Sequence, residues 1–512
     1  MKWENVTSNE AILLLGPKTE ISLTEEFNNV ISLSAFRRLQ DKAQVFPLKT
    51  GDFIRTRLTH SIEVMSTADE IGNLVVGKLK EKEFNKLLEK IKANKNQNVD
   101  SKDVTKYSKS VEILERIPQL LKSASILHDM GNPPFGHIGE EIISNWFNKK
   151  LKSYYIKSKT ENLSQIYEYD EVSENKDFKK KYSKLSEVLS NKQRLDLCNF
   201  EGNAQLLRVL FKLNNCDKSF SVGVVGTCMK YTCSSEKYLA SKKSNLIWNK
   251  KIGYYTSEEE YAKFVFDTIE SNGVRSPLAF MLEAADDISY LLSDIEDAIK
   301  KKLLTYEEVY QKIVDVCDKS ANEYVKSASE SLKNYQTKSK TELEKIYNFK
   351  KTIRSCLIKD VVKTFINKCD DILQGKFTNE LLSCGDCEQI VKSLRGFLKN
   401  KVYHSQIIAT EKTKVHTILN TLLDAYVPAS FLIEKTSSNK GESKHQMICE
   451  LFSENYKAAC KKELRAINEK CISQQEKLAE KVYAVLRLAV DEISGMTDYY
   501  ALKQYKIITA SN

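Results

Sequence analysis

The chain has 512 residues, of which 41% are hydrophobic and 29% charged, proportions that indicate a globular protein with a large core and exclude a disordered one. Its formal net charge of +10 is modest for this length, so it permits a polyanionic partner without indicating one. Twelve scattered cysteines, no secretion signal and no apolar run of the ~20 residues needed to span a bilayer lead us to expect a cytoplasmic protein without membrane contact.

The residue usage predicts an all-α fold with little or no β-structure. Only 17 glycines and 7 prolines interrupt the chain, and Leu, Lys, Glu, Ala and Ile dominate it. These residues favour long helices over many short strands. No linker rich in Pro, Ser or Gly separates the patterned segments, so we expect one continuous helical body.

Two helical patterns occur in the first 130 residues. Apolar residues recur at three- and four-residue spacing over residues 59–79, which predicts a helix with His60 in its first turn. A second helical segment runs over residues 111–130, where Pro118 marks an expected break. Its last residues include His128 and Asp129.

A stiff turn follows at once, with the sequence GNPPFGH over residues 131–137. Two glycines and two consecutive prolines favour an irregular backbone. We therefore expect His137 to be presented from a loop, separate from the preceding helix.

A further amphipathic helix is predicted over residues 277–299. Asp286, Tyr290 and Asp294 lie at i, i+4 and i+8, so their side chains share one helix face. From about Leu303 onward, helical patterns alternate with short turns and contain no further cluster of metal-binding residue types.

The histidines are scarce and gathered beside acidic residues. Three of the six His residues fall within an ordered set of strings: R-x-x-H ending at His60, HDMGNPPFGHxGE from His128, and EAADDISY from Glu283. Two imidazoles and two carboxylates form a ligand set suited to octahedral Mn²⁺, Mg²⁺ or Fe²⁺ with open water positions, which indicates a catalytic metal. The alternative is a group of hydrogen-bonded polar residues in the core. Spacing alone leaves open whether Asp286 or Asp287 is the later ligand.

These motifs resemble the HD superfamily, and longer strings resemble bacterial dGTPases, which are deoxyguanosine triphosphate triphosphohydrolases. The strings are QVFPL (44–48), RTRLTHS (55–61), HDMGNPPFGHIGE (128–140), NFEGNAQ (199–205), KYT (230–232), EAADDISYLLSDIEDA (283–298) and ISGMTDYYAL (493–502). The resemblance implies an HD-type helical catalytic core over residues 1–310. It also implies a C-terminal helical region over residues 311–512 that completes the nucleotide pocket and the oligomer contacts.

The resemblance implies a metal site and a catalytic histidine. The implied ligands of a divalent metal, Mg²⁺ or Mn²⁺ with Co²⁺ as an alternative, are His60, His128, Asp129 and Asp286. The family pattern D-x-x-x-Y-x-x-x-D fits Asp286, and so favours it over its neighbour. His137 matches the catalytic histidine, with Glu140 as the carboxylate that orients it.

The resemblance also implies a set of substrate contacts, formed by Gln44, Val45, Arg57, Asn203, Lys230, Tyr231, Tyr290, Asp294, Tyr403 and Glu411. Arg57 and Lys230 would contact phosphates. Gln44 and Asp294 would hold the 3′-hydroxyl, and Tyr290 would pack under the deoxyribose. Tyr403 and Glu411 match positions near the base.

The implied reaction converts dGTP and water to deoxyguanosine and triphosphate. No arginine occurs in residues 431–445, where a base contact would be sought, so a broad-specificity dNTPase remains an alternative. Further alternatives are an HD phosphodiesterase or single-strand nuclease and a non-catalytic nucleotide sensor. The resemblance implies a homo-oligomer, a hexamer or a tetramer, and raises single-stranded DNA as a candidate regulator.

Overall fold

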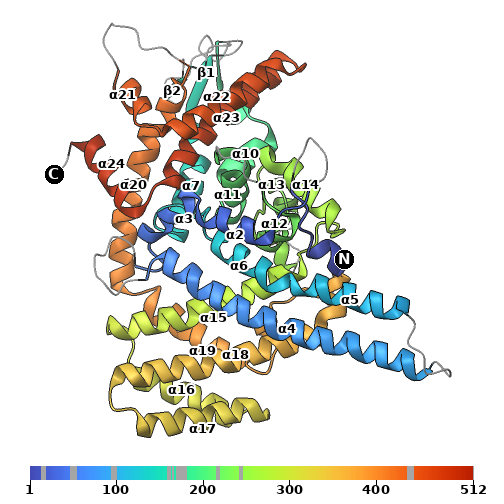
Figure 1. Ribbon diagram of the computed structural model, residues 1–512. Helices are drawn as coiled ribbons and strands as arrows, with labels where there is room; N and C mark the ends of the chain where they lie inside the picture. The colour runs from blue at the N-terminus through green and yellow to red at the C-terminus, as the bar shows by residue number, and fades with distance from the viewer. Residues whose placement is uncertain are drawn as a thin grey trace.

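The computed structural model describes residues 1–12, 19–46, 55–93, 101–157, 163, 166–168, 181–214, 219–240, 246–434 and 443–510. Its described residues are predominantly helical, which confirms the expected all-α class (Figure 1). None of the helices in these ranges is both long and apolar enough to cross a membrane.

Three long helices form the centre of the molecule: α4 (Arg57–Ala93), α6 (Ile117–Leu127) and α15 (Pro277–Lys300). α4 packs against both of the others. The predicted break is confirmed, because α5 (Ser101–Glu115) ends before α6 begins and Pro118 lies in the first turn of α6. Proline is tolerated there because the first amide groups of a helix have no intrahelical acceptor. α4 is longer than predicted and extends with α5 beyond the body (Figure 1).

A second group of helices stands beside this centre. It contains α7 (His137–Lys150), α20 (Gln406–Ser430), α22 (Glu454–Glu469), α23 (Gln474–Gly495) and α24 (Asp498–Thr509). α20 packs against α7, α23 and α24, so it connects the helix that starts at His137 to the last two helices of the chain.

A third group lies below α15 in Figure 1. It contains α16 (Tyr306–Asp318), α17 (Glu323–Lys338), α18 (Glu342–Leu373) and α19 (Glu388–Phe397). α18 contacts both α15 and α4, and α19 contacts α15. These contacts support the helix that carries Asp286 from the side opposite the second group.

Shorter helices complete the described chain. They are α1 (Trp3–Val6), α2 (Leu23–Ile31), α3 (Ser34–Arg38), α9 (Leu185–Val188), α10 (Asn191–Cys198), α11 (Gly202–Arg208), α12 (Val222–Cys228), α13 (Ser235–Ala240), α14 (Glu259–Thr268) and α21 (Lys444–Glu450). Several begin with a serine that accepts a hydrogen bond from the third helical residue, as Ser190 does from Gln193.

Apart from isolated bridges, the β-structure of the described residues is one small antiparallel sheet in the order β2-β1-β3. Its strands are β1 (Tyr154–Lys157), β2 (Ile166–Glu168) and β3 (Tyr182–Lys184). Tyr155 pairs with Tyr167 on one side and Lys184 on the other. The first strand of the sheet directly follows α7 in the sequence.

The buried apolar side chains form two main clusters. One surrounds α4, α6, α12, α15 and α18, and the other surrounds α7, α20, α22 and α23. Both contain residues from before and after residue 310, and the expected division of the chain at that position remains a prediction.

Candidate active site

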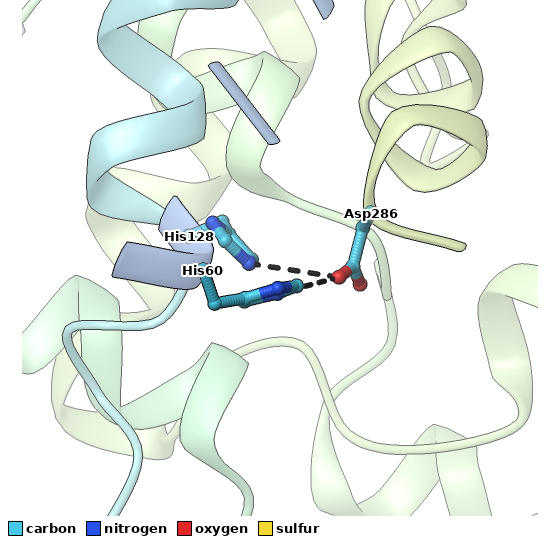
Figure 2. A group of neighbouring side chains, drawn as sticks. All are labelled: His60, His128 and Asp286. Carbon is cyan, nitrogen blue, oxygen red and sulfur yellow. Dashed lines mark hydrogen bonds and ion pairs between the residues drawn. The ribbon is translucent and has the colours of Figure 1, made fainter. Parts of the chain in front are cut away.

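Three predicted metal ligands converge from three helices. His60 lies in the first turn of α4 as predicted, His128 directly follows α6, and Asp286 lies on α15. Nε2 of His60 is 3.0 Å from Oδ1 of Asp286, and Nε2 of His128 is 3.9 Å from the same oxygen (Figure 2). The three side chains form a group that could hold a metal ion.

The hydrogen bonding of His128 suits a ligand. Its Nδ1 lies 2.6 Å from the carbonyl oxygen of Ser125, an acceptor, so Nδ1 carries the proton. Nε2 is buried and has no hydrogen-bond partner among the described residues, so it is the nitrogen that could face a cation. Metal-binding histidines are held in this way by a carbonyl at their second nitrogen. The mixed nitrogen and oxygen donors could hold a divalent metal ion.

Asp129 lies beside this group and has other partners. Its Oδ1 is 3.6 Å from Nε2 of His128 and accepts a hydrogen bond of 2.5 Å from the Asn132 side chain. Its Oδ2 is 2.9 Å from a guanidinium nitrogen of Arg57. Burial opposes ionisation of Asp129, but the charges of Arg57 and the two imidazoles together outweigh it and lower the pKa of Asp129 to about 2. A charged carboxylate next to the imidazoles is consistent with a fourth ligand.

The contact between His60 and Asp286 shifts the pKa of each group in favour of its charged form. Burial would lower the pKa of His60, but the hydrogen bond and charge of Asp286 raise it. Burial would raise the pKa of Asp286, yet the hydrogen bond from His60 and the nearby cationic groups hold it well below its usual range. The site therefore presents an ionised carboxylate to any bound cation.

The predicted loop position of His137 is wrong, because His137 is the first residue of α7. The irregular turn ends one residue earlier, at Gly136, whose φ is 60°. A Cβ at Gly136 would lie 2.5 Å from a guanidinium nitrogen of Arg57, so glycine is required there for both backbone and space. The two prolines indicated the turn correctly, but no local signal marked its end.

The expected pairing of His137 with Glu140 is present. Nδ1 of His137 is 2.8 Å from Oε2 of Glu140, while Oε1 accepts the backbone N–H of Gly202 at 2.8 Å. Burial opposes ionisation of Glu140, but the hydrogen bond from His137 and the charge of Lys251 lower its pKa to about 2. The ionised carboxylate fixes the proton on Nδ1 and leaves Nε2 free to accept one. The His137 side chain is 79% exposed, whereas Glu140 is buried.

A cavity of about 780 Å³ brings the predicted site residues together. Those on its wall are Gln44, Val45, Arg57, His60, His128, Asp129, His137, Asn203, Lys230, Tyr231, Asp286, Tyr290, Asp294 and Tyr403. Its size is that of a pocket for a nucleotide-sized molecule. Glu140 is not on the wall but is hydrogen-bonded to His137, which is. Glu411 is buried on α20, and its neighbour Lys412 reaches the wall instead.

One wall carries a polar pair on the predicted face of α15. The Tyr403 hydroxyl donates to Oδ2 of Asp294 at 2.9 Å, and Oδ1 of Asp294 is buried without a hydrogen-bond partner. Burial raises the pKa of Asp294 to about 7. This oxygen is available to accept a hydrogen bond from a ligand hydroxyl.

Several wall residues were not predicted from the sequence. Arg395 on α19 contacts Asp287 at 2.5 Å and Glu380 at 3.2 Å, and Lys251 contacts Glu201 at 2.7 Å. Arg395 and Lys251 belong to none of the motifs and come from distant segments of the chain. The contact of Asp287 distinguishes the two adjacent aspartates as candidate ligands, because Asp286 faces the histidines whereas Asp287 faces Arg395.

Residues 47–48 of the first matching string, and residues 435–442 of the segment without arginine, lie outside the described residues. Of the residues expected near a base, Tyr403 lies on the wall of the cavity, together with Ile408 and Lys412.

Comparisons with known proteins match the whole length of the chain. A protein of Listeria monocytogenes named deoxyguanosinetriphosphate triphosphohydrolase-like protein is 30% identical over 519 aligned residues, covering 99% of each chain. The deoxyguanosinetriphosphate triphosphohydrolase of Klebsiella pneumoniae is 30% identical, covering 94% of this chain and 92% of its own. The protein of that name from Serratia proteamaculans is 28% identical with the same coverage. No protein-family model matches the chain.

Proposed function

The chain belongs to the deoxyguanosinetriphosphate triphosphohydrolase family, and from this we propose that it is a metal-dependent hydrolase of deoxynucleoside triphosphates. The preferred substrate is dGTP, and the products are deoxyguanosine and inorganic triphosphate. The observation that carries the proposal is the shared cavity, which is lined by the group of His60, His128 and Asp286, by His137 and by the cations Arg57 and Lys230.

We assign four residues to the metal: His60, His128, Asp129 and Asp286. A bound divalent cation would supply Lewis acidity, neutralising charge on the phosphoryl oxygens during attack. Arg57, which contacts Asp129, would remain close enough to pair with the α-phosphate. Lys230, whose Nζ is 3.4 Å from Glu283, would contact the phosphate chain from α15's side of the cavity.

We assign proton transfer to His137. Its Nδ1 proton is held by Glu140, so its exposed Nε2 can accept the proton of the attacking water. Water adds to the α-phosphorus, the bond from that phosphorus to the 5′-oxygen breaks, and the 5′-oxygen takes a proton as the deoxynucleoside leaves. Triphosphate is the second product, and no covalent enzyme intermediate is required. Positioning and charge stabilisation supply the rest of the acceleration.

We assign sugar recognition to the face of α15. The unpartnered Oδ1 of Asp294 would accept a hydrogen bond from the 3′-hydroxyl, with Gln44 on the same substrate atom. Tyr290, also on the wall, would pack under the deoxyribose where a 2′-hydroxyl would collide. Asn203, Tyr231 and Val45 would line the rest of the substrate pocket.

The test is a panel of the four dNTPs and GTP with purified protein and Mn²⁺ or Mg²⁺, with products separated by HPLC. Deoxyguanosine and triphosphate from dGTP, with little turnover of GTP, are the expected result. Comparable turnover of all four dNTPs would support the broad-specificity alternative. Mononucleotides from single-stranded DNA would instead identify a nuclease. Binding of dNTPs without turnover under any of Mn²⁺, Mg²⁺ or Co²⁺ would identify a nucleotide sensor.

A homo-oligomer, a hexamer or a tetramer, and regulation by single-stranded DNA complete the proposal. Light scattering at several protein concentrations tests the first. The second is tested by adding an oligonucleotide to the dGTP assay, where a changed KM or kcat is expected.

A further inference from the structure

The string ISGMTDYYAL has no role in the proposed reaction, yet one of its residues reaches the loop that leads into His137. Asp498 is the first residue of α24 and is buried. Its Oδ1 accepts the backbone N–H of Phe135 at 2.9 Å, and its Oδ2 accepts the backbone N–H of Ala43 at 3.1 Å. One carboxylate thus joins two segments that are 363 and 455 residues away in sequence.

Both segments lead directly to the cavity. Phe135 is two residues before His137, and Ala43 is followed by Gln44 and Val45 on the wall. Asp498 itself is not among the residues that line the cavity. Its hydrogen bonds therefore act on the site through the two backbone segments that they hold.

The Phe135 backbone needs such support. Its φ is 64°, in the left-handed region that side chains with a Cβ rarely adopt. A conformation of this kind costs of order 1–3 kcal/mol and persists only where its surroundings impose it. The hydrogen bond from its N–H to a buried carboxylate is of the charge-assisted kind that can impose it.

Lys42 connects the same three segments a second time. Its Nζ is buried and donates to the carbonyl oxygen of Asn132 at 2.6 Å and to that of Ser494 at 2.9 Å. Asn132 belongs to the loop, and Ser494 lies just before α24. The Asn132 side chain in turn donates a hydrogen bond to Asp129. The loop is therefore held at Asn132, next to the metal group, and at Phe135, close to His137.

We propose that Asp498 is a positioning residue, whose carboxylate fixes the 131–137 loop and the 42–45 segment relative to each other so that His137 and Gln44 face the same substrate. The inference rests on the proposed function, because it assigns catalytic work to His137. It assigns a structural role to the string ISGMTDYYAL, which is distant in sequence from the metal-binding motifs.

The test uses Asp498→Asn in the full-length chain. An amide has one acceptor oxygen, so only one of the two backbone N–H groups can keep its hydrogen bond. We expect faster hydrogen–deuterium exchange confined to residues 131–137 and 42–46. We also expect kcat to fall by about tenfold or more, as misplacement of a catalytic group causes, with a smaller change in KM. Affinity for Mn²⁺, measured by titration calorimetry, should be unchanged.

The matched control is Thr497→Ala. The Thr497 side chain caps α24 by accepting the backbone N–H of Tyr500, so its loss weakens the same helix end without touching the loop. A lower melting temperature with unchanged kcat is expected. If Thr497→Ala lowered kcat as much as Asp498→Asn did, or if exchange in the two segments were unaltered in Asp498→Asn, the inference would be overturned.

Two further outcomes remain decisive. Should Asp498→Asn fail to fold, Asp498→Ser, whose shorter side chain has a single oxygen and cannot accept both backbone N–H groups, should produce the same local pattern of exchange; unaltered exchange there would contradict the inference. If the unmodified protein hydrolysed no dNTP, the proposed function would fail. The exchange data would still decide whether Asp498 positions the loop.

Discussion

His60 and Asp286 are 226 residues apart in the sequence, yet Nε2 of one lies 3.0 Å from Oδ1 of the other. The same carboxylate oxygen faces Nε2 of His128 at 3.9 Å. Asp286 therefore closes a group to which α4 and the end of α6 contribute the imidazoles. Asp287, the next residue along α15, is directed to Arg395 instead.

Replacing Asp286 should remove metal binding, whereas replacing Asp287 should not. Loss of groups that merely orient metal ligands costs about 10–100-fold in affinity, and loss of a ligand should cost more. We expect Asp286→Asn to weaken Mn²⁺ binding by more than about a hundredfold in titration calorimetry. Asp287→Asn, the matched control on the same helix turn, should bind Mn²⁺ normally.

The two variants would exchange their outcomes if Asp287 were the ligand. Normal Mn²⁺ binding by Asp286→Asn would thus disprove the ligand assignment. Circular dichroism of both variants excludes a loss of fold as the cause.

Replacing His137 should separate rate from metal binding. Proton transfer by a positioned side chain contributes about 10²–10⁴-fold, so His137→Ala should lower kcat for dGTP within that range. Its Mn²⁺ affinity should be unchanged because His137 is outside the group of His60, His128 and Asp286. His416→Ala removes an exposed histidine of α20 and should keep full activity. Release of Mn²⁺ by His137→Ala would mean that His137 is a ligand.

The parts of the site that could be predicted depend on helix periodicity and on local motifs. The helical spacing of residues 277–299 was sufficient to place Asp286, Tyr290 and Asp294 on one helix face, and all three line the cavity. The phase of residues 59–79 placed His60 in a first turn, which is also confirmed. Periodicity works here because residues four apart in a helix share a face, which holds even for α15, although nearly all of its residues are buried.

The rest depends on contacts between distant segments. Arg395 and Lys251 meet wall carboxylates only after the chain has folded, and neither has a neighbour that marks it. The start of α7 at His137 was also missed; the loop before it is hydrogen-bonded at Phe135 to Asp498 from the other end of the chain. Local sequence indicates a turn there without fixing where the next helix begins.

Glu26 should make the protein less stable as pH rises. Its Oε1 accepts the backbone N–H of Ser221 at 2.7 Å, and its Oε2 accepts the Ser221 hydroxyl at 2.8 Å. Burial raises its pKa from 4.5 to about 7, although these bonds to Ser221 oppose the rise. The folded state therefore holds a proton more tightly than the unfolded state. Its contribution is complete below about pH 4.5 and is lost as pH rises to about 7 and beyond.

The variant Glu26→Gln should remove that dependence. One pKa unit corresponds to about 1.4 kcal/mol, so the Glu26 contribution to the free energy of unfolding changes by up to about 3 kcal/mol between pH 4.5 and 8. Urea unfolding at several pH values should show a shallower decline for Glu26→Gln than for the unmodified protein. Glu25→Gln, at an exposed neighbouring position, should keep the original slope. Parallel curves for all three proteins would contradict the assignment.

Phe365 and Leu343 give a matched pair on α18, the helix that supports α15 from below. Phe365 is fully buried and packs near Trp3, with ring centroids 6.4 Å apart, whereas Leu343 is 68% exposed. Phe365→Ala should cost about 3–5 kcal/mol in urea unfolding because it leaves a cavity, and Phe365→Leu should cost less. Leu343→Ala should change stability by less than about 0.5 kcal/mol. A loss for Leu343→Ala that grew with protein concentration would instead mean that this face is buried in an oligomer, since assembly stabilises by mass action.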